Sequence, residues 1–140
     1  MTLHDLSQLY YLNREIEYDQ QRLEELRADS GAPSSPVITG LPHSPSYSGS
    51  KVEREALAIV TLEQLIENKI KRCQLELIRL QQFIEDIPDS LTRQVYQYRF
   101  VNGLDWQQVA EHIGGGNTEE AVKKRCYRYL KQYNKERGIK

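Results

Sequence analysis

The sequence predicts an all-α protein, in which a long antiparallel helical hairpin, like a coiled coil, is followed by a three-helix domain. A seven-residue repeat of apolar residues runs through residues 51–87, and a shorter helical pattern covers residues 3–28. A stretch rich in Pro, Gly and Ser at residues 30–50 lies between them. Beyond the repeat, short helical patterns alternate with glycine turns. We therefore expect two domains, the hairpin over residues 1–87 and the three-helix domain over residues 88–140.

The first predicted helix, residues 3–28, begins at a cap formed by Thr2 or Asp5. Its apolar residues are spaced by alternating steps of three and four, with Asp19 as a polar interruption: Leu9, Leu12, Ile16, Leu23 and Leu26. The following residues 30–50 carry four of the five prolines in the chain, a composition typical of an irregular linker. The apolar residues within it leave an ordered, partner-binding loop as the alternative.

The second predicted helix, residues 51–87, keeps steps of four and three throughout, and Glu63 is the only polar residue in the repeat. A repeat of this kind indicates a coiled-coil seam, and another helix must cover it. We favour the first helix, folded back antiparallel. The alternative is the same helix in a second copy, which would make a homodimer. The seam residues are Val52, Ala56, Ile59, Glu63, Ile66, Ile70, Cys73, Leu77, Leu80, Ile84 and Ile87.

Pro88 ends this helix, and three shorter helices are predicted after it. The first covers residues 90–101, begins at Asp89 or Ser90, and has an inner face of Leu91, Val95, Tyr98 and either Phe100 or Val101. The second is capped by Asp105 and has Val109, Ala110 and Ile113 on its inner face. Three glycines, Gly114, Gly115 and Gly116, form a turn before the third, which Asn117 or Thr118 caps.

The last predicted helix has two chemically different faces. Its inner face is apolar and holds Val122, Cys126, Tyr129, Leu130 and Tyr133. Its outer face is basic and holds Lys123, Lys124, Arg125, Arg128 and Lys131. Two helices that meet at a tight turn, with the second basic on its outside, match the layout of a helix-turn-helix that binds DNA. A helical hairpin that binds nothing has the same local pattern, so this observation alone decides little.

The charge distribution favours nucleic acid at the C-terminal end. Residues 88–140 contain 10 Lys and Arg against 6 Asp and Glu, a formal net charge of +4. Residues 1–87 contain 9 against 14, a formal net charge of −5. This asymmetry is typical of a basic DNA-binding module with an acidic extension.

Several classes of function are not expected. We find no phosphate-binding glycine loop, nucleophile motif or pair of catalytic carboxylates, so we do not expect an enzyme. His4, His43 and His112 share no metal-ligand spacing, and no cofactor is expected. No apolar run reaches the roughly 20 residues of a membrane span, and no signal peptide is evident. Cys73 and Cys126 fall at apolar helix positions, which favours small core residues in a reducing cytoplasm.

The C-terminal residues resemble the region-four domain of bacterial sigma factors over residues 88–133. The residues that carry this resemblance are Tyr98, Arg99, Phe100, Gly103, Leu104, Asp105, Trp106, Gln107, Gln108, Val109 and Ala110, followed by Val122, Cys126, Tyr129 and Leu130. The whole layout is similar to small sigma-like regulators encoded by phages and prophages, including the ArpU-like late transcription regulators. One departure is the turn between Ile113 and Val122, which is longer than in that domain and contains three glycines.

The resemblance implies a sequence-specific transcription regulator of phage or prophage genes, with double-stranded DNA and host RNA polymerase as partners. On this resemblance, the exposed positions of the last helix are Thr118, Glu119, Glu120, Lys123, Lys124, Tyr127, Arg128 and Lys131. Glu119 or Glu120 suits a cytosine amino group, Lys123 or Lys124 suits guanine acceptors, and Arg128 and Lys131 suit phosphates. Tyr127 is either a DNA contact or a partly exposed aromatic. Gln107 and Gln108 are further phosphate candidates. Arg125 is equally suited to an acidic neighbour or to DNA. We expect Trp106 to pack at the edge of the small core.

Two alternative functions remain at this point. A phage DNA-packaging recognition subunit, like the small terminase subunit, would also combine a helix-turn-helix with coiled-coil oligomerisation. A polymerase-binding adaptor would use the same domain to bind protein and would not contact DNA. Salt-dependent binding to duplex DNA separates this adaptor from the two DNA-binding functions.

Overall fold

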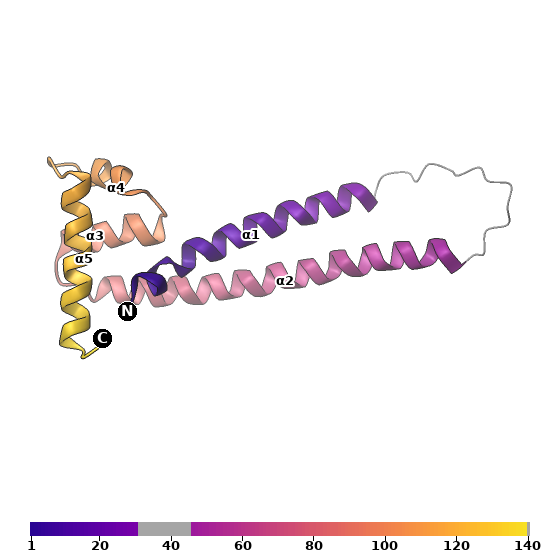
Figure 1. Cartoon of the computed structure of the whole chain (residues 1–140), viewed down its shortest axis with the longest axis horizontal. Helices are drawn as coiled ribbons and strands as arrows, with labels where there is room; N and C mark the ends of the chain where they lie inside the picture. Colours follow the sequence, from indigo (N-terminus) through magenta and orange to yellow (C-terminus); the bar gives the residue numbers. More distant parts are fainter. Residues whose placement is uncertain (31–45, 140) are drawn as a thin grey trace. The chain divides into compact units, whose positions relative to one another are not determined.

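The computed structural model describes residues 1–30 and 46–139, and every regular element in these ranges is helical. The predicted all-α class is therefore confirmed for this part of the chain. The elements are α1 (Leu3–Ser30), α2 (Ser46–Glu85), α3 (Ser90–Tyr96), a π-helical turn η1 (Gln97–Val101), α4 (Trp106–Ile113) and α5 (Glu119–Glu136) (Figure 1).

The segment predicted as a linker is shorter than expected. α1 continues to Ser30, and α2 begins at Ser46, directly after Pro45. No proline follows Pro45 until Pro88, so no proline blocks this early start, although Gly49 within it is a poor helix former. Residues 31–45 lie outside the described part of the chain.

The chain divides into two compact units. One consists of Met1–Asn13 and Arg72–Lys140, and the other of Arg14–Lys71. Each unit thus contains part of α1 and part of α2. The predicted division of the chain between residues 87 and 88 falls within the first unit and stays a prediction.

In the unit Arg14–Lys71, a buried ion pair explains why the polar residue Asp19 interrupts the apolar spacing of α1. The side chain of Asp19 is only 10% exposed, and its Oδ2 lies 2.6 Å from Nζ of Lys69. Glu15 Oε2 is 3.4 Å from the same ammonium. The hydrogen bond from Lys69 to Asp19 raises the pKa of Lys69 above its ordinary value. The carboxylate takes an apolar position because a cation from α2 neutralises it there.

The rest of this unit has an apolar core at one end and an exposed surface at the other. Ile16, Leu23 and Ile66 are buried, and farther along Arg27 pairs with Glu63 at 2.6 Å. The predicted seam is not buried throughout, because Val52 is 66% exposed and Ala56 is exposed as well. A regular repeat therefore marks which face is apolar, but not how far a partner covers it.

The unit that contains α3, α4 and α5 has an aromatic core. These three helices pack against one another (Figure 1). Tyr96 is fully buried, with its ring centroid 5.7 Å from those of both Phe83 and Tyr129. Its hydroxyl donates a hydrogen bond of 2.8 Å to the carbonyl of Cys126. Burial raises the pKa of the Tyr96 hydroxyl, and it raises the pKa of the Cys126 thiol to about 11.

The inner face predicted for residues 90–101 is correct at Val95 and, of the two alternatives, at Phe100, but it includes Tyr98 and omits Tyr96. The buried residues are Thr92, Val95, Tyr96 and Phe100, whereas Tyr98 is only partly buried. Thr92, Tyr96 and Phe100 are four residues apart, so they share one face of a helix. Tyr96 on this face packs against Phe83 and Tyr129. The π-helical turn, in which the N–H of residue 102 donates to the carbonyl of residue 97 at 3.0 Å, comes after Tyr96.

The start of α1 belongs to the same unit and is fixed there. Thr2 Oγ1 accepts from the N–H of Asp5 at 3.1 Å, and Asp5 Oδ2 accepts from the N–H of Thr2 at 2.8 Å, so the two residues cap the helix together. Asn134 Nδ2 donates to the carbonyl of Met1 at 2.8 Å, and Leu6 is buried. The first turn of α1 is therefore tied to the end of α5.

Within the described residues, none of the helices is both long enough and apolar enough to cross a membrane.

Replacing Lys69 with Met should lower the free energy of unfolding by about 1–3 kcal/mol, because the buried carboxylate of Asp19 would lose its cation. Chemical denaturation followed by circular dichroism would measure this loss. The matched control is Lys71→Met, since the side chain of Lys71 is 65% exposed and its ion pair is with an exposed glutamate. The double variant Asp19→Leu with Lys69→Met should regain most of the stability. Equal stability of Lys69→Met and Lys71→Met would contradict this account.

Candidate nucleic-acid interface

The start of α4 is fixed by the predicted cap. Oδ1 of Asp105 accepts from the N–H of Gln108 at 2.8 Å, and Oε1 of Gln108 accepts from the N–H of Asp105 at 3.0 Å. This reciprocal arrangement leaves only the side-chain amide NH₂ of Gln108 for an outside group. Gln107 is exposed, and its Nε2 lies 3.5 Å from Oε1 of Glu111. Both predicted phosphate candidates therefore lie at the exposed start of α4.

The turn between α4 and α5 depends on its glycines. Gly114, Gly115 and Gly116 have φ values of 65°, 63° and 76°, a region that L side chains rarely adopt. Nδ2 of Asn117 donates to the carbonyl of Gly114 at 2.8 Å and closes the turn. Thr118 is the N-cap of α5, since its Oγ1 accepts from the N–H of residue 121 at 3.2 Å. Of the two caps that the sequence allowed, Thr118 is therefore the one used.

The rotation of α5 about its own axis is set by its buried residues. Val122, Cys126 and Leu130 are each at most 7% exposed and lie four residues apart on one face. The opposite face therefore points outward. The predicted contact residues on α5 are all exposed, namely Glu119, Glu120, Lys123, Lys124, Tyr127, Arg128 and Lys131.

A row of four cations runs along the outward side of α5. Lys124, Arg128, Lys131 and Lys135 follow one another at steps of four, three and four, so they share one face of the helix. We call this row the basic face. Sequence reasoning missed Lys135, although the same spacing would have identified it.

Most of the charge on α5 is not neutralised within the described residues. Lys124 lies 3.8 Å from Glu120, and both side chains are largely exposed, so water screens this pair. Arg128, Lys131, Lys135 and the adjacent Lys123 form no ion pair with any residue that the structure describes. The two glutamates lie in the first turn of α5, where the helix dipole favours negative charge. The acidic start of α5 is thus separated along the helix from the basic face, and the further acidic residue Glu136 lies at the end of the helix.

Arg125 has a structural partner. Its Nη1 donates to Oδ2 of Asp89 at 2.9 Å and lies 3.5 Å from Oγ1 of Thr92. The same Asp89 oxygen caps α3 by accepting from the N–H and the hydroxyl of Thr92. These hydrogen bonds to Thr92, helped by Arg125, lower the pKa of the Asp89 carboxyl below its usual value. Of the two roles that the sequence left open for Arg125, the ion pair is the one present.

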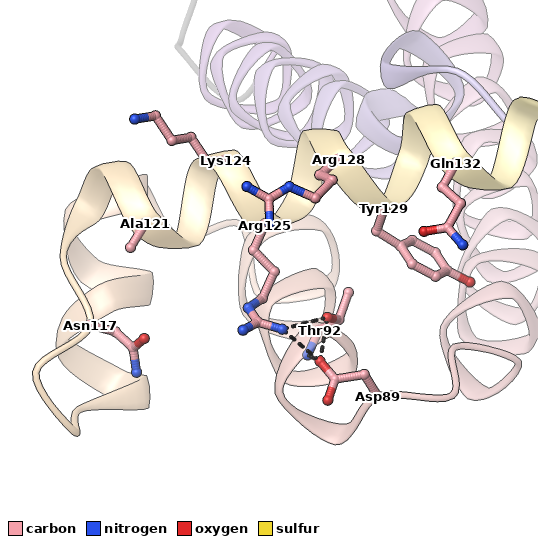
Figure 2. A pocket seen from close by; sticks show the side chains of 9 residues that line it. All are labelled: Asp89, Thr92, Asn117, Ala121, Lys124, Arg125, Arg128, Tyr129 and Gln132. Carbon is pink, nitrogen blue, oxygen red and sulfur yellow. Dashed lines mark hydrogen bonds and ion pairs between the residues drawn. The ribbon is translucent and has the colours of Figure 1, made fainter.

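A groove of about 470 Å³ lies where α5 passes the start of α3 (Figure 2). Arg125 spans it toward Asp89, whereas the Lys124 side chain extends away from α3. Arg128 and Gln132 from α5 and Asn117 from the turn complete its polar lining. Gln132 and Asn117 were not predicted as site residues, and only packing of α5 on α3 brings them to this groove.

Trp106 packs at the edge of the core. It is partly buried, and the guanidinium of Arg99 lies 4.8 Å from the centroid of its ring. The ring of Tyr127 meets it edge-on at 6.0 Å. Nη1 of Arg99 also donates to the carbonyl of Leu104 at 2.8 Å. The stack links the start of α4 to the middle of α5 and leaves Tyr127 39% exposed.

No group of His, Cys, Asp and Glu side chains within the described ranges is arranged to hold a metal ion. No protein-family model matches the chain, and the searches of curated proteins and of solved structures likewise find no match.

Replacing Val122 with Asp should disrupt the packing of α5 and unfold this part of the chain, because the substitution buries a charge that has no partner. We expect a loss of more than about 3 kcal/mol, measured by thermal melting and near-ultraviolet circular dichroism. Ala121→Asp is the matched control, since it adds the same group at the adjacent exposed position. A cooperative, natively folded Val122→Asp variant would refute the assignment of this face as buried.

The pH dependence of stability should report on Asp89. Because folding lowers its pKa, the carboxylate stabilises the folded state above its unfolded pKa, and this contribution is lost as the pH falls through the folded value. Asp89→Asn can still cap α3 but carries no charge. Its melting temperature should therefore fall less between about pH 5 and about pH 3 than that of the natural chain. Thr92→Val, which removes the hydroxyl hydrogen bond, should be intermediate. An unchanged pH profile for Asp89→Asn would show that these bonds do not form.

Proposed function

We propose that the chain binds double-stranded DNA through the basic face of α5 and acts as a sequence-specific transcription regulator. The observation that carries the proposal is the row of cations on that face, most of which have no counter-charge among the described residues. The row covers 11 residue steps, roughly 16 Å of helix. This length is comparable to the width of a major groove, about 12 Å, whose phosphates line both edges.

The chemistry along α5 also supports sequence recognition. Glu119 and Glu120 are exposed at the N-terminal end, where a recognition helix enters the groove and meets base edges. A carboxylate there can accept from a cytosine amino group but would be repelled by a phosphate. The neighbouring Lys123 and Lys124 suit guanine acceptors, and Arg128 and Lys131 suit phosphates. The helix therefore has different groups for specificity and for affinity.

The proposal includes a finer description of the fold. We infer that α4, the glycine turn and α5 form a helix-turn-helix, supported on its inner side by α3. We also infer that α1 and α2 form an antiparallel hairpin. In the unit Arg14–Lys71, Asp19 of α1 pairs with Lys69 of α2. Arg27 lies farther along α1, but its partner Glu63 lies earlier in α2, as an antiparallel pair of helices requires. Control of phage or prophage genes rests on the sigma-like sequence resemblance, and host RNA polymerase is the partner it suggests.

Selection from a pool of random duplex DNA at two salt concentrations tests the proposal. We expect an enriched sequence motif, and affinity that falls roughly a hundredfold between 50 and 200 mM salt if four phosphates are contacted. Lack of enrichment at both salt concentrations would overturn it and favour the protein-binding adaptor.

Lys124→Ala and Arg128→Ala should each weaken binding to the selected duplex by about 3- to 10-fold and reduce the salt slope by about one. Both side chains are on the outside, so the melting temperature should not change. Lys71→Ala is a close control for Lys124→Ala. It removes the same charge from a side chain that is 65% exposed, against 68% for Lys124, and each lysine pairs with a glutamate four residues earlier. If Lys124→Ala and Arg128→Ala bind DNA as tightly as the natural chain and the control do, the basic face is not the DNA surface.

A further inference from the structure

The unit Arg14–Lys71 has only a small core of its own. Among its described residues, the buried apolar side chains are those of Ile16, Leu23 and Ile66. Two packed helices leave a face uncovered on each side, and helical domains usually cover such a face with a further layer of helices. The apolar surface that this unit leaves exposed therefore needs an explanation.

The two sides of this helix pair differ in chemistry. Leu65 and Glu67 flank the buried Ile66 by about 100° on either side of α2, so they lie on opposite sides of the pair. On the Leu65 side is a groove of about 460 Å³, lined mostly by apolar residues, namely Leu26, Leu57, Ala58, Leu62 and Leu65, together with Arg22, Arg54 and Thr61. On the Glu67 side the lining is mostly polar, with Gln20, Glu24, Arg27, Glu63 and Glu67 beside Leu23, Ile66 and Ile70. One side alone is therefore suited to a further apolar layer.

The α2 wall of the apolar groove has the spacing of a hole in a coiled coil. Such a hole is formed by four residues of one helix and receives a single large side chain, the knob, from the facing helix. Here the four residues are at positions i, i+3, i+4 and i+7, namely Ala58, Thr61, Leu62 and Leu65. Ala58 and Thr61 are small and exposed, and Leu65 is 45% exposed, so the hole is open to a knob from outside.

The register of α1 on α2 identifies a knob that fits this hole. The ion pairs of Asp19 with Lys69 and of Arg27 with Glu63 place Leu26 level with about residue 63 of α2. A two-fold axis that runs parallel to the helices over the groove keeps every residue at its own level. It places α1 of a second copy antiparallel on α2, with Leu26 within about 3 Å, along the helix, of the centre of the hole. Each copy then gives one knob and receives one, as an isologous dimer requires.

Charge and composition favour the same occupant. Asp29 is exposed and lies three residues after Leu26 and seven after Arg22, so it shares the groove side of α1. In the antiparallel arrangement, Asp29 of one copy extends from the hole toward Arg54 of the other. The aliphatic lining also suits a second copy, because homodimer interfaces are more apolar than the surfaces that bind transient partners.

We propose that this groove binds Leu26 of a second copy, so that two helix pairs form a two-fold symmetric four-helix bundle. The hole formed by Ala58, Thr61, Leu62 and Leu65 of each copy receives Leu26 of the other, while the seam around Ile66 stays inside each copy. The proposal rests on the antiparallel hairpin inferred above. It is independent of DNA binding, since all its residues lie in the unit Arg14–Lys71.

Sedimentation equilibrium of the full chain over micromolar concentrations tests for the dimer. We expect a dimer for the natural chain and a dimer at least about tenfold weaker for Leu65→Glu, which puts a charge in the hole. Val60→Glu is the matched control, since Val60 is 60% exposed and lies about 140° around α2 from Leu65. It should dimerise as the natural chain does, and circular dichroism should show equal helix content in all three. A monomeric natural chain, or equal weakening by both substitutions, would overturn the proposal.

A pair of size changes tests whether Leu26 is the knob. Ala58→Trp fills the hole and should weaken self-association, because it clashes with the incoming leucine. Leu26→Ala removes the clash, so the Ala58→Trp chain should bind the Leu26→Ala chain more tightly than it binds the natural chain. Energy transfer between differently labelled chains would measure both affinities. A preference of the Ala58→Trp chain for the natural chain would show that Leu26 does not enter this hole, and would refute the proposal.

Discussion

The rotation of α5 about its axis is the constraint on which the candidate interface depends. Burial of Val122, Cys126 and Leu130 fixes that rotation, and every cation of the basic face points outward as a consequence. The ion pair between Arg125 and Asp89 adds a second restraint, because it joins the middle of α5 to the first turn of α3. A helix held by both an apolar stripe and an ion pair presents its outer side chains in one orientation, as recognition of a rigid duplex requires.

The caps and the glycine turn are predictable from sequence because their causes are local. Asp105, Thr118 and the glycine triplet act on backbone groups within three or four residues, and they occupy the expected positions. The core of residues 90–101 was less predictable. Helical spacing allows more than one inner face in this segment, and Tyr96 is buried in place of Tyr98. The energetic reason is tertiary, since Tyr96 reaches the carbonyl of Cys126, thirty residues away.

The same distinction between local and tertiary causes applies to the candidate site. Helical spacing alone predicts which residues of α5 point outward, and those residues are exposed. The partner of Arg125 could not be selected from spacing, because Asp89 is 36 residues earlier and meets Arg125 only through the packing of α3 on α5. Asn117 and Gln132 were missed for the same reason. In α2, the apolar repeat correctly predicted most of the buried residues from Ile66 to Ile87. It did not predict that the start of the repeat, at Val52, is exposed.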